Sequence, residues 1–239
     1  MISIIIPTLN EESVIERTLK NLRTIKSVPY EIIVADTKSK DRTRETAEQY
    51  ADTVVVYSGE KRPNAGIIRN LGASVAKGDL FLFQDADVLL QDADRFAAAV
   101  QEAFEKDPKL VGLTAATRVT TEFETLTDRV MYWIINRTFV ILNLLRIGGS
   151  GGECQVVRRD AFEKVGGYTE SLPIAEDNEL FQKLTKIGRT RIRLDLLTRH
   201  PGRRSRALGW PRLLWQWQTS WITMTFLHKS AADTWEEIR

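Results

Sequence analysis

The sequence predicts an α/β protein built on a mostly parallel, doubly wound sheet. Two observations predict this class: short apolar runs recur through the first third of the chain, and segments of helical pattern separate them. The runs expected to form strands are residues 2–6, 31–35, 53–57 and 80–83. Strands and helices that alternate at this spacing favour parallel pairing through right-handed crossovers.

Start and stop signals predict the other elements. Asn10 is expected to cap a helix over residues 12–25, and Pro63 to open a helix over residues 63–76. A further helix is expected to begin at residues 41–43. The rest of the chain is expected to form strands at 110–116, 154–157 and 191–197, and helices at 127–146, from 160, at 175–187 and at 211–228.

The composition is that of a folded protein, with 43% hydrophobic and 28% charged residues among 239. The single cysteine, Cys154, excludes an internal disulfide and fits a reducing compartment. Residues 1–10 lack the basic lead and long apolar core of a signal peptide. We therefore expect a chain that folds without disulfides or a secretory leader.

Two carboxylates follow the buried strand at residues 80–83. Asp85 and Asp87 are one residue apart, so in an extended chain their side chains point the same way. Such a pair suits a divalent cation that also contacts a diphosphate. The alternative is a loop whose aspartates cap the next helix. Because sheets of this class bind ligands at the carboxyl ends of their strands, the rest of the chain favours the cation site.

Other polar residues are expected at the same edge of the sheet. Asp36 ends the second strand, where it is suited either to bind a base or ribose or to stabilise a turn. Arg69 lies on the helix after Pro63, from which it reaches toward a phosphate or faces water. The donor-binding candidates at this edge are Pro7, Thr8, Asn10, Glu11, Asp36, Lys61, Gly66 and Arg69.

Four of these segments form a recognisable set of motifs. P-T-L-N-E-E begins at Pro7, D-T-K-S-K-D-R-T at Asp36, R-N-L-G at Arg69 and Q-D-A-D at Gln84. In this order and spacing they resemble the nucleotide-binding half of family 2 glycosyltransferases, which have the GT-A fold. The likeness covers about half of the chain. It implies a nucleotide-sugar donor, with GDP and UDP both open as the nucleotide.

The resemblance also implies a metal. Asp85, Ala86 and Asp87 form the family's D-x-D motif, which would bind the donor through Mn²⁺ or Mg²⁺. His200 is a further candidate to ligate this metal or to stabilise the leaving group. A lone histidine is also explained by a structural role.

An acceptor site is implied by a second motif. The tripeptide G-G-Y at residues 166–168, a short loop and then Glu176 and Asp177 are similar to the family's acceptor motif. The second acid of that motif is the general base in inverting members, which implies Asp177 as the base and Glu176 as its neighbour. Acids in the first turn of a helix also favour the helix dipole, which is the alternative interpretation.

Arginine is concentrated near the end of the chain. Eight arginines but one acid, Asp195, lie from Arg189 to Arg212. Such a block indicates an anionic partner: phosphates, nucleic acid or a lipid surface. Because guanidinium groups bind phosphate oxygens in pairs, Arg203 and Arg204 are candidates to close over the donor diphosphate.

Two amphipathic helices are expected to lie in a membrane interface. In the helix at 127–146, Arg129, Asn136 and Asn143 recur every seven residues and form one polar stripe. A core helix with a few buried polar groups is the alternative. The helix at 211–228 combines tryptophan with nearby arginine, a mixture that favours the headgroup layer.

The segment before residue 154 is rich in glycine and is expected to contact the acceptor. Gly151 and Gly152 leave backbone amides free to face a sugar, or form a hinge, and Glu153 follows them. Trp210 is a further acceptor candidate, since this region loosely resembles the interfacial helix of cellulose-synthase-type enzymes. The acceptor-binding candidates are Gly151, Gly152, Glu153, Glu176 and Trp210.

We therefore expect an inverting, metal-dependent glycosyltransferase that moves mannose from GDP-mannose to a lipid-linked acceptor at the cytoplasmic face of the cell membrane. The expected divisions are a catalytic domain at 1–200, with a donor half at 1–116 and an acceptor half at 117–200, and a membrane-interface segment at 201–239. The alternatives are a nucleotidyltransferase acting on sugar phosphates and a non-catalytic nucleotide-binding protein that docks to membranes. Nucleic acid is not an expected partner, because the aromatic residues form helical stripes rather than a stacking surface.

Overall fold

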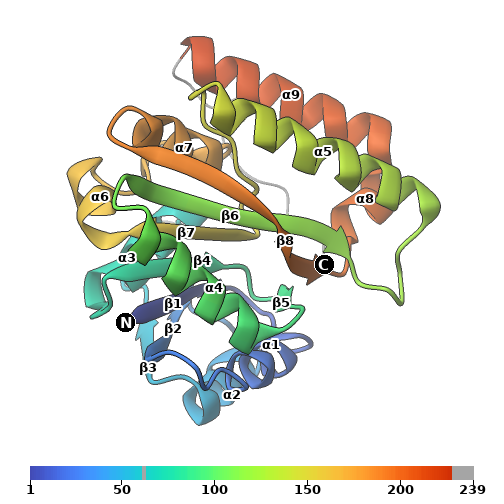
Figure 1. Ribbon diagram of the computed structural model, residues 1–239. Helices are drawn as coiled ribbons and strands as arrows, with labels where there is room; N and C mark the ends of the chain where they lie inside the picture. Colours follow the sequence, from blue (N-terminus) through green and yellow to red (C-terminus); the bar gives the residue numbers. More distant parts are fainter. Residues whose placement is uncertain (61–62, 228–239) are drawn as a thin grey trace.

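The computed structural model describes residues 1–60 and 63–227 of the chain. These residues form an eight-stranded mixed sheet with helices packed on both faces (Figure 1). Two helices, α5 (Leu126–Leu144) and α9 (Trp210–Leu227), lie next to each other on one side of the molecule. The structure confirms the α/β class that the sequence predicts.

The first half of the sheet is parallel, as expected. Its strands are β1 (Ile2–Thr8), β2 (Tyr30–Asp36), β3 (Thr53–Val56) and β4 (Leu80–Gln84). The helices between them are α1 (Ile15–Leu22), α2 (Thr43–Tyr50) and α3 (Ala65–Val75). Because β1 pairs in parallel with both β2 and β4, the carboxyl ends of these three strands lie at one edge.

The second half of the sheet is mixed. Its strands are β5 (Leu89–Leu90), β6 (Leu110–Val119), β7 (Cys154–Arg158) and β8 (Arg189–His200), and the sheet order is β3-β2-β1-β4-β7-β6-β8-β5. β7 lies antiparallel between β4 and β6, with Cys154 opposite Gln84. The glycine-rich segment before β7 therefore meets the aspartates that follow β4.

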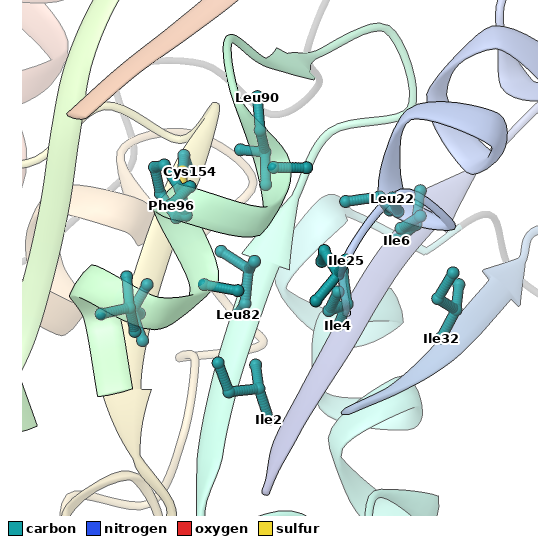
Figure 2. Close-up of a cluster of buried hydrophobic side chains, with 14 of the residues drawn as sticks. Ile2, Ile4, Ile6, Leu22, Ile25, Ile32, Leu82, Leu90, Phe96 and Cys154 are labelled. Atoms are coloured by element: carbon teal, nitrogen blue, oxygen red, sulfur yellow. The ribbon is translucent and has the colours of Figure 1, made fainter. Parts of the chain in front are cut away.

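Apolar side chains cover both faces of the sheet. The remaining helices are α4 (Ala93–Lys106), α6 (Arg159–Lys164), α7 (Glu176–Thr185) and α8 (Arg203–Leu208). On one face, Ile4 and Leu82 pack with side chains of α1 and α4 (Figure 2). On the other face, Phe81 and Phe83 pack with α6 and α7. Burial on both faces explains why β4 is a continuous apolar run.

Two helix starts differ from the prediction. Asn10 does not cap α1: its backbone is left-handed, with φ 52°, and its side chain accepts a hydrogen bond from the backbone N of Lys40. Asn64, and not Pro63, opens α3, because the Asn64 side chain accepts the capping hydrogen bond. The other predicted elements are present with shifted ends, and residue 228 lies outside the described residues.

Candidate active site

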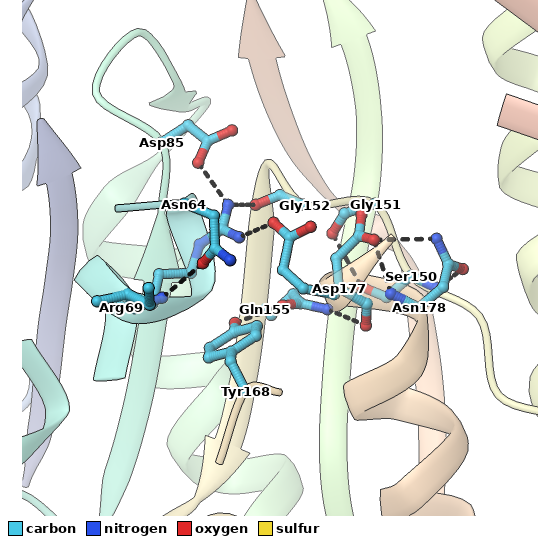
Figure 3. A network of polar contacts seen from close by, with 12 residues as sticks. Asn64, Arg69, Asp85, Ser150, Gly151, Gly152, Gln155, Tyr168, Asp177 and Asn178 are labelled. Carbon is cyan, nitrogen blue, oxygen red and sulfur yellow. Dashed lines mark hydrogen bonds and ion pairs between the residues drawn. The ribbon is translucent and has the colours of Figure 1, made fainter. Parts of the chain in front are cut away.

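The two aspartates after β4 are each paired with an arginine. Asp85 Oδ1 accepts a hydrogen bond of 2.8 Å from Nη2 of Arg69, which reaches it from α3 (Figure 3). Asp87 Oδ2 accepts hydrogen bonds of 2.6 and 3.0 Å from Arg203 of α8. The Asp85 side chain is 38% exposed and that of Asp87 is 15% exposed, so solvent still reaches both carboxylates.

Arg69 connects this edge to the first turn of α7. Its Nη1 donates a hydrogen bond of 2.7 Å to Glu176, and its Nη2 donates one of 3.2 Å to the carbonyl of Gly152. The Arg69 side chain is only 4% exposed. The expectation that Arg69 faces water is therefore wrong, whereas the contact of Arg69 with a phosphate stays a prediction.

Asp177 lies beside this network. Its Oδ1 accepts a hydrogen bond of 2.7 Å from the backbone N of Asn178. A Cβ atom at Gly152 would lie 3.2 Å from Asp177 Oδ2 and 3.4 Å from Nη2 of Arg69. Because a side chain there would press on both groups, glycine allows this close approach. The structure thus brings Asp177 next to the arginine that holds Asp85.

The residue before the acid pair has a strained backbone. Ala175, which precedes α7, has φ 67°, in the left-handed region. This conformation costs a non-glycine residue about 1–3 kcal/mol and is found preferentially at functional sites. The strain adds to the reasons for placing the site at the first turn of α7.

Burial raises the pKa of three carboxyl groups near Arg69. Burial raises the pKa of Glu176 to about 7, although the charge of Arg69 opposes the shift. Burial, with the negative charges of Asp85 and Asp177, raises the pKa of Glu153 to about 7. Burial also raises the pKa of Asp177. Carboxylates with raised pKa values are better proton acceptors near neutral pH than ordinary ones.

The same edge offers ligands that suit a divalent cation. Carboxylate oxygens and a neutral imidazole nitrogen are donors that Mn²⁺ accepts. Nε2 of His200 is buried without a hydrogen-bond partner among the described residues, and burial lowers the pKa of this ring, close to the charge of Asp87. The donor set of Asp85, Asp87 and His200 therefore fits a cation. Across residues 1–60 and 63–227, however, no three acidic, histidine or cysteine side chains already converge on one point.

The loop after β1 and helix α8 meet at this edge. Nη2 of Arg203 lies 3.2 Å from Oε2 of Glu11, so one guanidinium contacts both Glu11 and Asp87. Arg204 follows in the same helix. A cleft of about 470 Å³ continues from here and is lined by Asn10, Ser13, Val14, Pro201, Arg203, Arg206 and Ala207. The structure therefore brings Asn10, Glu11 and Arg203 together.

Three donor-binding candidates are buried among protein partners. The carboxylate of Asp36 is fully buried and accepts hydrogen bonds from Thr8 Oγ1 and from the backbone N of Ser39. Ala86 is 4% exposed, and its carbonyl accepts a hydrogen bond from Thr18. In this structure Thr8, Asp36 and Ala86 thus shape the loops and do not present side chains to a donor.

The remaining candidates are Pro7, Gly66, Gly151 and Lys61. Pro7 is half-buried at the end of β1, and Gly151 lies in the loop next to Gly152. Gly66 lies in the first turn of α3, where a Cβ atom would come 3.6 Å from Cγ of Glu176. Lys61 lies outside the described residues. The donor contacts predicted for Pro7 and Gly66 stay predictions.

Trp210 was expected to bind the acceptor, and this expectation is wrong. Its side chain is 9% exposed, and its Nε1 donates a hydrogen bond of 2.9 Å to Asp128 at the start of α5. Its ring packs edge to face against Tyr132 and Trp217. Trp210 therefore packs the start of α9 against α5. Sequence alone could not distinguish a core tryptophan from an interfacial one.

Two residues that hold the backbone of Asp177, Tyr168 and Gln155, are not among the site residues predicted from the sequence. Tyr168 Oη donates a hydrogen bond of 2.6 Å to Gln155, and Gln155 donates one of 3.0 Å to the carbonyl of Asp177 (Figure 3). Gln155 is fully buried. A polar residue inside the apolar run at 154–157 was the signal that could have identified it.

The arginine block does not form one cationic surface. Arg189 and Arg191 both pair with Asp107, at 3.3 and 3.1 Å, and Arg193 pairs with Asp195. These arginines lie along β8, away from those of α8. Several charges of the block are therefore balanced within the protein, and the anionic partner stays a prediction for the arginines of α8.

Helix α5 turns its polar stripe toward the protein. Asn136 accepts a hydrogen bond from the backbone N of Thr117, and Asn143 donates one of 2.8 Å to the carbonyl of Gly149. The two asparagines of the stripe are thus buried, as the core-helix alternative predicts, whereas Arg129 is exposed. The outer side is nevertheless apolar, and its exposed residues include Leu126, Val130, Trp133, Ile134, Ile141 and Leu144. Across the part of the chain that the structure describes, no helix is long and apolar enough to cross a membrane.

A sheet edge that carries two aspartates at the carboxyl ends of parallel strands is suited to bind a cation and a phosphorylated ligand. Residues 3–166 match the model of the family described as "Glycosyl transferase family 2". The chain therefore belongs to glycosyltransferase family 2. This result confirms the resemblance inferred from the motifs at Pro7, Asp36, Arg69 and Gln84.

Known proteins of this kind are similar to the chain over different lengths. An uncharacterized glycosyltransferase of Haemophilus influenzae is 27% identical over 197 residues, which are 77% of this chain and 62% of that protein. A dolichol-phosphate mannosyltransferase of Pyrococcus furiosus is 36% identical over 92 residues, which are 36% of this chain and 26% of that protein. The chain thus spans less than two thirds of either relative.

A solved structure shares the fold. The mannosyltransferase PcManGT from Pyrobaculum calidifontis, in complex with GDP-Man and Mn²⁺, superposes with a TM-score of 0.73 at 19% sequence identity. The match covers 95% of this chain and 63% of that one. At this identity the likeness shows the fold and no more.

Proposed function

We propose that this chain carries out inverting, metal-dependent transfer of a sugar from a nucleotide-sugar to an acceptor hydroxyl. One observation carries the proposal: Arg69 bonds both to Asp85 and to Glu176, so one arginine joins the donor-side and acceptor-side acids. Membership of glycosyltransferase family 2 supports a nucleotide-sugar as the donor.

The donor diphosphate would lie at the acidic strand edge. Asp85, Asp87 and His200 would hold Mn²⁺ or Mg²⁺, which when bound offsets the charge of the diphosphate. Arg203 would exchange its bonds to Asp87 and Glu11 for phosphate oxygens and so stabilise the leaving nucleoside diphosphate. Arg204 is the second candidate for this contact. The Mn²⁺ bound to the Pyrobaculum enzyme supports a divalent metal in this role.

Asp177 would act as the general base. Its carboxylate takes the proton of the acceptor hydroxyl while the acceptor oxygen bonds to the anomeric carbon and the nucleoside diphosphate leaves from the opposite side. Such a base contributes about 10²- to 10⁴-fold to the rate. The raised pKa of Asp177 suits this task, because it makes the carboxylate a stronger proton acceptor.

We propose GDP-mannose as the donor and mannose as the transferred sugar. Two similar proteins support it: one is a mannosyltransferase in complex with GDP-Man, and the other is a dolichol-phosphate mannosyltransferase. The latter also supports a lipid-linked sugar or glycan as the acceptor. UDP-linked sugars are the alternative donors.

A lipid-linked acceptor requires access to a membrane surface, and we assign this role to the outer side of α5. Its exposed apolar residues are accompanied by Arg129, Arg137 and Arg146, whereas the acid of this helix, Asp128, is buried. Apolar side chains bordered by arginine suit an anionic membrane interface. The proposed location is the cytoplasmic face of the cell membrane.

A transfer assay tests the proposed function. The chain is incubated with Mn²⁺, radiolabelled GDP-mannose or UDP-sugars, and polyprenyl-linked sugar acceptors in detergent. We expect labelled lipid product and an equal amount of nucleoside diphosphate. In a parallel incubation with GTP and mannose 1-phosphate, formation of GDP-mannose with release of pyrophosphate would instead indicate a nucleotidyltransferase. Donor binding without any transfer would indicate a non-catalytic binding protein.

A further inference from the structure

Arg69 bridges two carboxylates that come from distant parts of the chain. It bonds to Asp85 at 2.8 Å and to Glu176 at 2.7 Å, across separations of 16 and 107 residues. The guanidinium also lies over the ring of Tyr168, at 5.4 Å from its centroid. Held on three sides and almost fully buried, this charged group has little freedom to leave either carboxylate.

A second route connects Arg69 to the acid pair. The ring of Tyr168 carries a hydroxyl that donates to Gln155, and Gln155 in turn donates to the carbonyl of Asp177. The first turn of α7 is thus held both through its side chain at Glu176 and through its backbone. Both connections begin at the same guanidinium.

The proposal that follows rests on the proposed function. We propose that Arg69 is a positioning residue that couples cation binding at Asp85 to the placement of Glu176 and Asp177. Its charge is shared between Asp85 and Glu176. If a cation binds Asp85, the guanidinium of Arg69 keeps its bond to Glu176. Through this bond it holds the first turn of α7, which carries Asp177. Conversely, loss of the Glu176 charge leaves Asp85 as the one carboxylate paired with Arg69 among the described residues, and Arg69 then competes more strongly with the cation.

Binding measurements without an acceptor test this coupling. The affinity for GDP and for UDP in the presence of Mn²⁺ is measured by calorimetry on the full chain at pH 8, where Glu176, with its pKa of about 7, is mostly ionised. We expect Glu176→Gln to weaken Mn²⁺-dependent binding about fivefold or more. Glu179→Gln is the matched control on the same helix, since Glu179 pairs with Lys183 and not with Arg69. It is expected to change the affinity less than about twofold.

A through-space effect of the lost charge must be distinguished from coupling through Arg69. Asp177→Asn removes an equal charge from the same turn without removing a bond to Arg69, and it is expected to change the affinity less than about twofold. In the Arg69→Lys background, where a single ammonium replaces the two-armed contact, Glu176→Gln is expected to lose most of its effect. Thermal unfolding checks that each variant is folded.

The outcomes separate this proposal from the proposed function. Equal effects of Glu176→Gln and Asp177→Asn, or an undiminished effect of Glu176→Gln with Arg69→Lys, would overturn the coupling and leave the proposed function standing. If Arg69→Lys does not fold, the comparison of Glu176→Gln with Asp177→Asn decides alone. Absence of Mn²⁺-dependent binding of either nucleotide to the unaltered chain would overturn both proposals.

Discussion

Nη2 of Arg203 lies 2.6 Å from Oδ2 of Asp87, although 116 residues separate the two in sequence. The same guanidinium contacts Glu11, so helix α8 closes over the acidic strand edge through one side chain. A positive charge of the protein thus neutralises the carboxylate that we assign to a metal. Donor binding would therefore require Arg203 to exchange these partners for phosphate oxygens.

Asp87→Asn is expected to weaken Mn²⁺-dependent donor binding about tenfold and sugar transfer about 100-fold, because it removes a charged ligand from the strand edge. Calorimetry with GDP and Mn²⁺ measures the first effect, and the radiolabel assay measures the second. Asp79→Asn is the matched control, since Asp79 is an 88% exposed aspartate near the other end of β4. If Asp87→Asn and Asp79→Asn had equal effects on binding and transfer, Asp87 would not be a ligand of the metal.

Glu153 makes the stability of the protein depend on pH. Its folded-state pKa of about 7 exceeds the ordinary value of 4.5, so the folded protein holds a proton that the unfolded chain has lost. This contribution to stability is present below about pH 4.5 and disappears as the pH rises through 7. Glu153→Gln is therefore expected to raise the free energy of unfolding by up to about 3 kcal/mol at pH 8 and little at pH 4.5. Denaturant unfolding at both pH values measures this, and an equal effect at both would contradict the raised pKa.

Trp210 is expected to matter for stability and not for acceptor binding. Trp210→Ala should lower the free energy of unfolding by about 3–5 kcal/mol, because it leaves a cavity and removes the hydrogen bond to Asp128. Trp215→Ala is the matched control: Trp215 is 69% exposed on the same helix, and its loss should cost about 0.5 kcal/mol or less. If Trp210→Ala kept its stability but lost acceptor affinity, the structural role would be wrong.

The outer side of α5 is expected to bind anionic membranes. Liposome flotation with phosphatidylserine-containing vesicles should carry the protein to the top of the gradient. Replacing both Trp133 and Ile134 by serine should reduce this binding about tenfold, because it removes exposed apolar area. Val75→Ser, at an exposed apolar residue of α3, should have little effect. Unaltered protein that stays in the aqueous fraction would contradict the proposed membrane contact.

The parts of the fold that depend on local pattern could be predicted from the sequence. The position of Asp85 and Asp87 follows from the sequence because an apolar run ends at them, and the ends of parallel strands lie together at one edge of a sheet. The antiparallel direction of β7 could not be predicted, because a strand buried on both faces has the same composition in either direction. Because β7 is antiparallel to β4, the loop that precedes β7 is the one that contacts Asp85.

The missing parts of the site depend on contacts between distant residues. Whether Arg69 faces water, a phosphate or a carboxylate depends on where α7 packs, which its helical pattern does not encode. Arg129, Asn136 and Asn143 recur as one polar stripe, but periodicity does not say which members of a stripe face solvent and which face the backbone of β6. In both cases the partner, and not the residue type, decides the role.

Asp177→Asn tests the central claim, that the acid of α7 removes the acceptor proton beside a donor held at Asp85 and Asp87. The measurement is turnover with GDP-mannose and a lipid-linked acceptor, together with the affinity for GDP and Mn²⁺. We predict that turnover falls by about 100-fold or more while the affinity for the nucleotide changes less than about twofold. Turnover that equals that of the unaltered protein would contradict the assignment of Asp177 as the base.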